Sequence, residues 1–477
     1  MNNIFELKEK LAKKEITEKE VFENSIKEAK KSQKDINPFV TILDSYEEIE
    51  GPLKGIPYAL KDNISTKGIL TTASSNILKD YVPVYDATVY KKLKDSGAML
   101  IGKTVLDELA IGGTGTTGHT GIVRNPWNTE RQIGGSSAGS AAAVALGIVP
   151  FAIGSDTGDS VRKPAAYGGI VGFKPTYGRI SRYGLFAFAS SLDHIGVFAR
   201  NVKDVAYVTN IIKGHDDNDM TSLPDDNKDY VKTLENNVKG KKLFYIKEAL
   251  ENNDNDKELE KILTNFEEVI KKCESLGIEV KEESIDIDLL KAMYPTYKTI
   301  SCAEVTSNDA NLTGIHFGPR GEGSTPEEII KDARTKGFSE LIKRRFVIGS
   351  YVLQKENQEK LFLNACRVRR LLVDKLNELF KTYDGLIMPA AASIAPKFSE
   401  SSDQLSDKYL ILDNHMVLGN FGGYPSITIP SGFVDEMPVG INLTGRIKED
   451  DLVLNIANKI ESTMPYKDQI AGGDKNV

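Results

Sequence analysis

The chain is poor in the residues that build disulfide frameworks and metal centres. Its 477 residues include three cysteines, five histidines and a single tryptophan. The cysteines, Cys273, Cys302 and Cys366, are odd in number, far apart and not in the paired spacings of metal sites. We therefore expect free thiols in a reducing, cytoplasmic compartment, with no metal site in this chain.

Long apolar runs and an excess of basic charge are also missing. No stretch reaches the roughly 18 apolar residues that a membrane span needs, and the charged N-terminal residues lack the apolar core of a secretion signal. The net charge of −7 argues against a broad nucleic-acid surface, so a partner would hold most of any RNA involved. We expect no membrane association.

Helical and strand patterns alternate along the chain, which favours an α/β fold with a mixed or parallel sheet. Residues 17–32 form an amphipathic pattern that opens with the capping pair Thr17 and Glu20. The other predicted elements are helices at 86–97, 259–277 and 355–381, strands at 99–102, 242–246, 278–280, 385–390 and 426–430, and a loop at 214–229. One large domain with a helical insertion near 285–350 fits this order.

A glycine- and serine-rich block at 134–163 contains two candidate nucleophile elements. These are Gly135-Ser136-Ser137 and Gly158-Asp159-Ser160, separated by a small apolar run typical of a buried helix and strand. Glycine lets the backbone pass close to a ligand, and free backbone amides can stabilise an oxyanion. The block therefore indicates acyl-transfer chemistry.

A nucleophilic serine needs a base, and two kinds of residue are available. None of the five histidines, His119, His194, His215, His316 and His415, lies in a recognisable triad element, so we expect them to be structural or on the surface. Lys61 ends the apolar run 55–60, and a buried lysine can be neutral near pH 7. The alternative role for Lys61 is an ion pair with Asp62 at the end of a strand.

Three elements together resemble the amidase signature family. They are GIPYALKD at 55–62, GGSS at 134–137 and DTGDSVRKPA at 156–165, in the family's order and at its spacing. The resemblance covers nearly the whole chain. It implies a large mixed β-sheet covered by helices on both faces, in a single amidase domain over 1–477. Within that domain we expect an N-terminal helical part at 1–60, a signature core at 61–205 and the helical insertion at 285–350.

The resemblance also implies a Ser-cisSer-Lys mechanism. Ser160 would be the nucleophile, and Ser136, in a cis peptide after Gly135, would relay the proton of Ser160 to Lys61. The backbone amides of residues 157–160, from Thr157 through Gly158 and Asp159, would form the oxyanion hole.

The chain departs from the family pattern at two positions, Ala138 and Asp159, where glycine is usual. The backbone amide of Asp159 is retained, so the oxyanion hole can persist. We expect its carboxylate to turn away, toward Arg162 or Lys163, because a carboxylate in the hole would oppose oxyanion formation. This substitution also leaves open a catalytically inactive scaffold.

Three further segments resemble one branch of the family, the glutaminase subunits of tRNA-dependent amidotransferases. They are RNPW at 124–127, GIVGFKPTYGRISRYGL at 169–185 and FASSLDHIG at 188–196. The resemblance implies hydrolysis of glutamine and delivery of ammonia to a partner that converts Glu-tRNA(Gln) to Gln-tRNA(Gln). It implies a heterotrimer with B and C subunits, tRNA held mainly by the B subunit, no cofactor in this chain, and ATP and Mg²⁺ on the partner subunit.

A glutamine pocket needs an acid for the ammonium group and an arginine for the carboxylate. The resemblance assigns Asp413 and Arg345 to these roles and Tyr297 to the pocket wall. From the residues alone, Arg344 and Arg345 would be a surface charge pair at the start of a helix. A free-standing amidase that acts on small amides, with an apolar pocket, is the alternative function.

Overall fold

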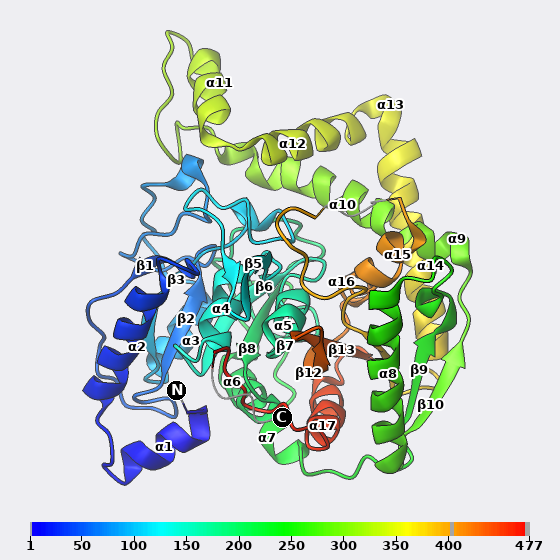
Figure 1. Cartoon of the computed structure of the whole chain (residues 1–477). Helices are drawn as coiled ribbons and strands as arrows, with labels where there is room; N and C mark the ends of the chain where they lie inside the picture. Colours follow the sequence, from blue (N-terminus) through cyan, green and yellow to red (C-terminus); the bar gives the residue numbers. More distant parts are fainter. Residues whose placement is uncertain (1, 401–404, 473–477) are drawn as a thin grey trace.

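An eleven-stranded mixed sheet runs through the computed structural model, which describes residues 2–400 and 405–472 (Figure 1). Its strands, in spatial order, are β1 (Phe39–Ile42), β3 (Met99–Thr104), β2 (Pro57–Lys61), β6 (Phe151–Asp156), β8 (His194–Ala199), β7 (Val171–Lys174), β12 (Ser426–Val434), β13 (Met437–Gly445), β11 (Gly385–Pro389), β9 (Lys242–Ile246) and β10 (Glu279–Glu283). Strand β2 pairs in parallel with β3 and β6, and β9 with β10 and β11, whereas the other neighbours are antiparallel. The predicted α/β class with a mixed sheet is confirmed.

Helices flank this sheet. Those of the first half are α1 (Ile4–Ala12), α2 (Glu18–Ser32), α3 (Thr88–Asp95), α4 (Ala138–Ala145), α5 (Arg162–Gly168), α6 (Val202–Ile212) and α7 (Tyr230–Thr233). Those of the second half are α8 (Lys257–Ser275), α9 (Ile287–Lys291), α10 (Met293–Asn308), α11 (Pro326–Gly337), α12 (Glu340–Val352), α13 (Lys355–Gln358), α14 (Asn364–Leu379), α15 (Asp407–Leu410), α16 (Val417–Phe421) and α17 (Asp450–Glu461). A separate two-stranded ribbon joins β4 (Arg124–Asn125) and β5 (Asn128–Gln132).

The glycine- and serine-rich block folds as its small residues predict. Every residue of α4 is buried, because alanine, glycine and serine let a helix approach the sheet closely. The chain then enters the fully buried strand β6 and leaves it through a short loop into α5. The carboxyl ends of the parallel strands β2 and β6 therefore lie side by side, with the loop after β6 at the same edge.

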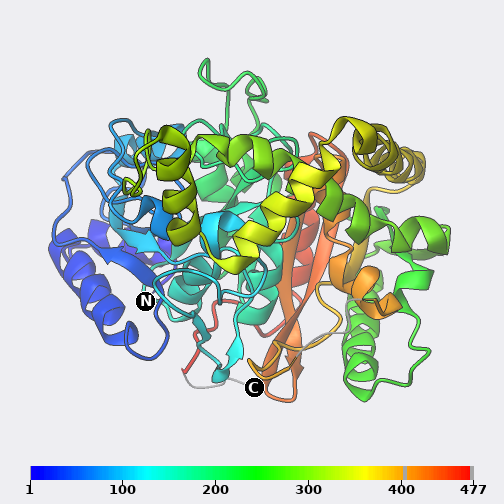
Figure 2. The ribbon, with the colours of Figure 1, turned by 90° about the horizontal axis from the view of Figure 1, so that it is seen from above.

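Helices α10 to α13 lie together along the upper edge of the molecule in Figure 1. Figure 2, the view from above, shows these yellow-green helices lying across the rest of the chain. Helix α10 packs against both α12 and α14, and its buried face places Thr296 and Ile300 inward. This arrangement brings residues near 297 and 345 to the same side of the molecule as the end of β6.

Most individual elements match their predicted positions, and one does not. Helix α2 has the predicted capping box between Thr17 and Glu20, and the strand predicted at 242–246 is β9. Residues 355–381 were predicted as one long helix. Instead a π-helical segment, η5 (Glu359–Leu363), separates α13 from α14. This irregularity was missed because the apolar spacing of the segment does not record a change of hydrogen-bond register.

Candidate active site

Lys61 lies at the point where β2 ends and its side chain is completely buried. Its Nζ is 2.8 Å from the hydroxyl of Ser136 and 2.8 Å from the hydroxyl of Ser155, and 3.2 Å from the Ser155 carbonyl. The neighbouring Asp62 has other partners: Lys103 lies 3.5 Å away, and the Thr72 amide and hydroxyl donate to the carboxylate. The alternative of a Lys61–Asp62 ion pair is therefore wrong.

The environment of Lys61 favours its neutral form. Burial lowers the pKa of the Lys61 ammonium from 10.5 to about 7, although the more distant carboxylates of Asp107, Asp156 and Asp193 act in the opposite direction. A lysine that is neutral near pH 7 and hydrogen-bonded to a serine hydroxyl can accept a proton from it. The geometry thus supplies a base without any histidine.

The histidines lie where we expected them. His194 and His415 are buried, and their Nδ1 atoms contact the carbonyls of Leu192 and Leu412 at 2.6 and 2.7 Å. Burial lowers the pKa of His415 to about 4 and that of His194 well below its ordinary value. His119, His215 and His316 are exposed.

Ser136 follows the cis peptide that the sequence predicted after Gly135. A Cβ atom on Gly135 would lie 2.1 Å from the Asp107 carboxylate and 2.9 Å from the Gly115 amide, so only glycine fits there. Asp107 in turn accepts hydrogen bonds from four successive backbone amides, those of residues 114–117. Asp107, held by these amides, lies against Gly135 and so restricts the backbone directly before Ser136.

Ser160 lies in the loop between β6 and α5 and is 4% exposed. In the described part of the chain, the backbone amides of residues 157–160 donate to no other protein group. Neighbouring side chains hold the loop from outside: the Arg162 guanidinium donates to the Gly158 carbonyl at 2.7 Å, and the Thr157 hydroxyl donates to Asp193 at 2.7 Å. The loop is ordered while its amides stay available to a ligand.

A buried ion pair anchors the base of this loop. Arg162 contacts Asp156 through Nε at 3.0 Å and Nη2 at 2.8 Å, and the same guanidinium donates to Asn420 at 2.6 Å. Burial alone would raise the pKa of Asp156, but the Arg162 guanidinium holds it well below its usual range. Sequence patterns did not indicate the hydrogen bond between Arg162 and Asn420, because these two residues are far apart in the chain.

Asp159 turns away from the amides, as predicted. Its carboxylate is 3.3 Å from Nζ of Lys163, whereas Arg162, the other predicted partner, is occupied by Asp156. Lys163 also contacts Asp413: the ammonium lies 3.2 Å from one carboxylate oxygen and donates to the Asp413 carbonyl. One lysine thus joins Asp159, beside the predicted nucleophile, to the residue predicted to bind an ammonium group.

Tyr297 and Arg345 approach the loop from the helical insertion. A Cβ atom on Gly158 would lie 3.0 Å from Cζ of Tyr297, so the phenol ring lies directly against the loop. Burial raises the pKa of the Tyr297 phenol, the Asp159 carboxylate raises it further and the Arg345 guanidinium lowers it. Arg345 is half-buried, contacts Cys302 Sγ at 3.8 Å and leaves its buried Nε without a partner, while Arg344 is exposed.

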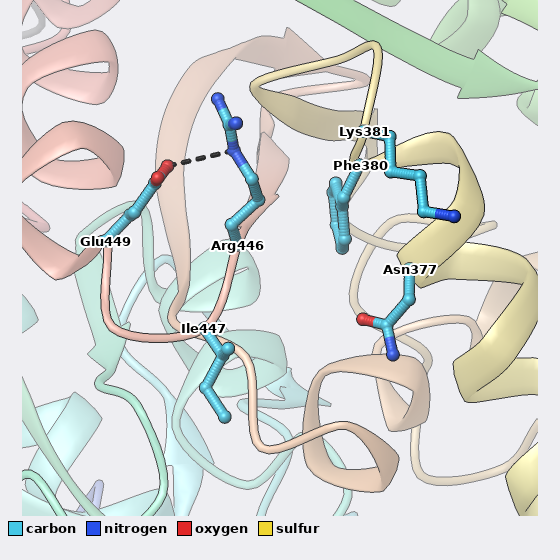
Figure 3. Close-up of a pocket in the computed structure, with 6 residues that line it drawn as sticks. All are labelled: Asn377, Phe380, Lys381, Arg446, Ile447 and Glu449. Carbon is cyan, nitrogen blue, oxygen red and sulfur yellow. Dashed lines mark ion pairs between the residues drawn. The ribbon is translucent and has the colours of Figure 1, made fainter.

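The structure thus brings the predicted site residues together from six separate segments of the chain. Two further residues at this site, Ser155 and Asp193, were not predicted to have roles there, and Lys163 was predicted only as a partner of Asp159. A small polar residue in an otherwise apolar buried strand was the only signal for Ser155. A different pocket, shown in Figure 3, contains none of the predicted residues and is lined by Asn377, Phe380, Lys381, Arg446, Ile447 and Glu449.

Within residues 2–400 and 405–472, no group of three or more histidine, cysteine, aspartate or glutamate side chains is placed to hold a metal ion. No helix in the same residues is both long and apolar enough to cross a bilayer. Cys273, Cys302 and Cys366 are free thiols.

Comparison with known proteins identifies the class of protein that this fold and site define. The sequence profile of the Amidase family matches residues 8–454, and the chain belongs to this family of enzymes. It is 42% identical over 431 residues to the A subunit of glutamyl-tRNA(Gln) amidotransferase from Pseudothermotoga lettingae, and the match covers 90% of this chain and 91% of the relative.

Solved structures agree with this assignment. The crystal structure of the A subunit of glutamyl-tRNA(Gln) amidotransferase from Thermotoga maritima superposes with a TM-score of 0.80 at 38% identity, covering 94% of this chain and 93% of that one. The peptide amidase of Stenotrophomonas maltophilia has a TM-score of 0.80 at 23% identity, with 98% and 97% covered, and shows the shared fold alone. The predicted amidase signature fold is confirmed.

Proposed function

We propose that this chain is the glutaminase subunit of a tRNA-dependent amidotransferase. The observation that carries the proposal is the buried Lys61, which has no carboxylate partner among the described residues, a pKa of about 7 and a 2.8 Å hydrogen bond to Ser136. The names of the most similar relatives supply the substrate class.

Acylation begins with neutral Lys61. It accepts the proton of the Ser136 hydroxyl while Ser136 takes the proton of Ser160, and the Ser160 oxygen bonds to the side-chain amide carbon of glutamine. The resulting oxyanion faces the free amides of residues 157–160. Removing one such donor typically costs about 3 kcal/mol in the transition state.

The C–N bond then breaks. The proton held by Lys61 returns through Ser136 to the leaving nitrogen, so ammonia departs and a glutamyl ester remains on Ser160. Water attacks this ester with the same base, which releases glutamate and restores the Ser160 hydroxyl. These steps consume only glutamine and water, and they need neither a redox partner nor a cofactor bound to this chain.

The ammonia passes to a partner subunit. There, in the proposed heterotrimer of A, B and C subunits, ATP and Mg²⁺ activate the glutamate of Glu-tRNA(Gln), and ammonia converts it to Gln-tRNA(Gln). The acidic balance of this chain, −7, supports the placement of tRNA mainly on the B subunit.

Selection of glutamine is assigned to three residues. Arg345 would bind the α-carboxylate through its guanidinium, Asp413 would bind the α-ammonium, and Tyr297 would form the wall beside Gly158. The Nε of Arg345 is buried and has no hydrogen-bond acceptor among the described residues, which is unusual in a folded protein. This free donor supports the assignment of Arg345 to the α-carboxylate.

Asp413→Asn tests this pocket and the alternative of a free-standing amidase. We expect the KM for glutamine to rise by about tenfold or more, because a charge-assisted contact to the ammonium is lost, while hydrolysis of butanamide changes little. Steady-state kinetics on both amides makes the comparison. Equal effects on the two substrates would mean that Asp413 is structural and would favour the general amidase.

Labelling with an electrophilic glutamine analogue tests the proposed function itself and the scaffold alternative. Intact-mass and peptide spectrometry should find one adduct, on Ser160, that excess glutamine prevents. Ser160→Ala is the control and should stay unlabelled. A wild-type protein that takes no label, in complex with its partner subunits, would support the inactive scaffold.

A further inference from the structure

Lys163 is a buried charged residue that joins two acidic residues beside the predicted pocket. Its side chain is 9% exposed, and its ammonium has three oxygen partners: the Asp413 carbonyl, one Asp413 carboxylate oxygen at 3.2 Å and the Asp159 carboxylate at 3.3 Å. The ammonium donates hydrogen bonds to both Asp413 oxygens and forms an ion pair with Asp159. The backbone amide of Lys163 also donates to the Asp159 carbonyl at 2.9 Å.

These contacts connect two parts of the site that are 250 residues apart in the chain. Asp159 adjoins Ser160 within the free-amide loop, residues 157–160. Asp413 lies in the 3-10 turn η6 (Leu412–Asn414). Lys163 itself is fixed in the first turn of α5, next to the buried Arg162–Asp156 pair. It is the direct connection between the loop and Asp413.

Charge explains why a lysine is needed there. The Asp159 and Asp413 side chains are only 20% and 22% exposed, so their carboxylates would repel each other strongly without a cation between them. Burial by itself would lower the pKa of Lys163, but the Asp413 and Asp159 carboxylates raise it well above its ordinary value. The three groups together carry one net negative charge, which complements one ammonium group.

We propose that Lys163 is a positioning residue. It holds the free-amide loop and Asp413 in fixed positions relative to each other and thereby gives the pocket its preference for amides bearing an ammonium group. The proposal rests on the glutaminase function proposed above. In each carboxylate, one oxygen contacts Lys163. Among the described residues, no hydrogen-bond donor contacts the second carboxylate oxygen of Asp413, so this oxygen remains available to a substrate ammonium.

Three variants in the assembled enzyme test this role. Lys163→Met keeps the length of the side chain and removes its charge. It should raise the KM for glutamine by about tenfold or more while kcat changes less than about threefold, because binding is lost and the Lys61–Ser136 relay is untouched. Lys163→Arg keeps the charge and should restore most of the affinity.

The double variant Asp159→Asn, Lys163→Met removes one of the two repelling carboxylates. Its KM for glutamine should fall back toward the wild-type value, and it remains informative if the single methionine variant fails to fold. If kcat falls by the same factor as KM rises in all three variants, the positioning role is wrong and Lys163 is structural. Absence of glutamine hydrolysis in the wild-type complex would instead refute the proposed function, and the role of Lys163 with it.

Discussion

At the scale of single residues, the chemistry depends on which lysine receives a carboxylate. Lys61 and Lys103 are both fully buried and lie on neighbouring strands, yet Asp62 pairs with Lys103 at 3.5 Å and leaves Lys61 to the serines. Burial lowers the pKa of both ammonium groups, but the Asp62 carboxylate holds the pKa of Lys103 at about 8, above the value of about 7 at Lys61. Because Asp62 pairs with Lys103 and not with Lys61, Lys61 is available for proton transfer.

The pH dependence of hydrolysis follows from this difference. Lys61 must be neutral to accept a proton, so log kcat/KM should rise with slope one as the pH approaches about 7 and level off above it. Lys61→Arg should be nearly as inactive as Lys61→Ala, about 10²–10⁴-fold below wild type, because a guanidinium stays protonated. Stopped-time glutamate assays from about pH 5.5 to 9, on both sides of this pKa, measure both effects. An arginine variant with near wild-type activity would exclude Lys61 as the base.

Asp159→Gly tests the charged residue in the nucleophile loop. Since its carboxylate contacts Lys163 and not the amides, we expect most glutaminase activity to remain. The free energy of unfolding should fall by about 1 kcal/mol, from a lost charge contact and the added freedom of glycine. Urea unfolding and steady-state kinetics check the two effects. A large gain in rate would show that the carboxylate inhibits the natural site.

At the scale of elements, the site forms because parallel strands β2 and β6 end at the same edge of the sheet. That pairing places Lys61 beside Ser155, and the loop after β6 then carries Ser160 toward the segment that holds Ser136. Helix α4 fits against the sheet because its residues are small. The backbone directly before Ser136 also requires a small residue, because Asp107 leaves no room for a side chain on Gly135.

Gly135→Ala should disrupt the site. Its Cβ would lie 2.1 Å from the Asp107 carboxylate, an overpacking that typically costs about 1–3 kcal/mol, and should displace Ser136. Thermal unfolding and glutamine hydrolysis should both show the loss. Gly113→Ala is the matched control, because a Cβ there meets nothing within 4 Å. Similar behaviour of the two variants would contradict the packing described around Asp107.

The elements also show how far the sequence predicts the structure. Local signals located α2 by its capping residues, β9 by its apolar run and the loop before Ser160 by its glycine. Contacts between distant segments had no such signal: the Arg162–Asn420 hydrogen bond and the contact of Lys163 with Asp413 depend on the order of strands in the sheet. The roles of Tyr297, Arg345 and Asp413 came from family resemblance and stay predictions.

At the scale of the whole molecule, the first and last described segments of the chain pack on the same body as the site. The Ile4 amide donates to Asp204 at 2.9 Å, and Asn3 and Asn201 both donate to Asp468. These contacts support the proposed single domain. Its division into an N-terminal part at 1–60, a core at 61–205 and an insertion at 285–350 stays a prediction, as do the partner subunits and the cytoplasmic location.

The assembled complex allows the most direct test of the central claim, that Lys61, Ser136 and Ser160 release ammonia for use on another subunit. The measurement is formation of Gln-tRNA(Gln) by a complex containing Ser160→Ala, with either glutamine or ammonium chloride as the nitrogen donor. We predict that glutamine-dependent synthesis is abolished and that ammonia-dependent synthesis proceeds at the wild-type rate. Loss of both activities in a correctly assembled complex, or persistence of the glutamine-dependent one, would contradict the account.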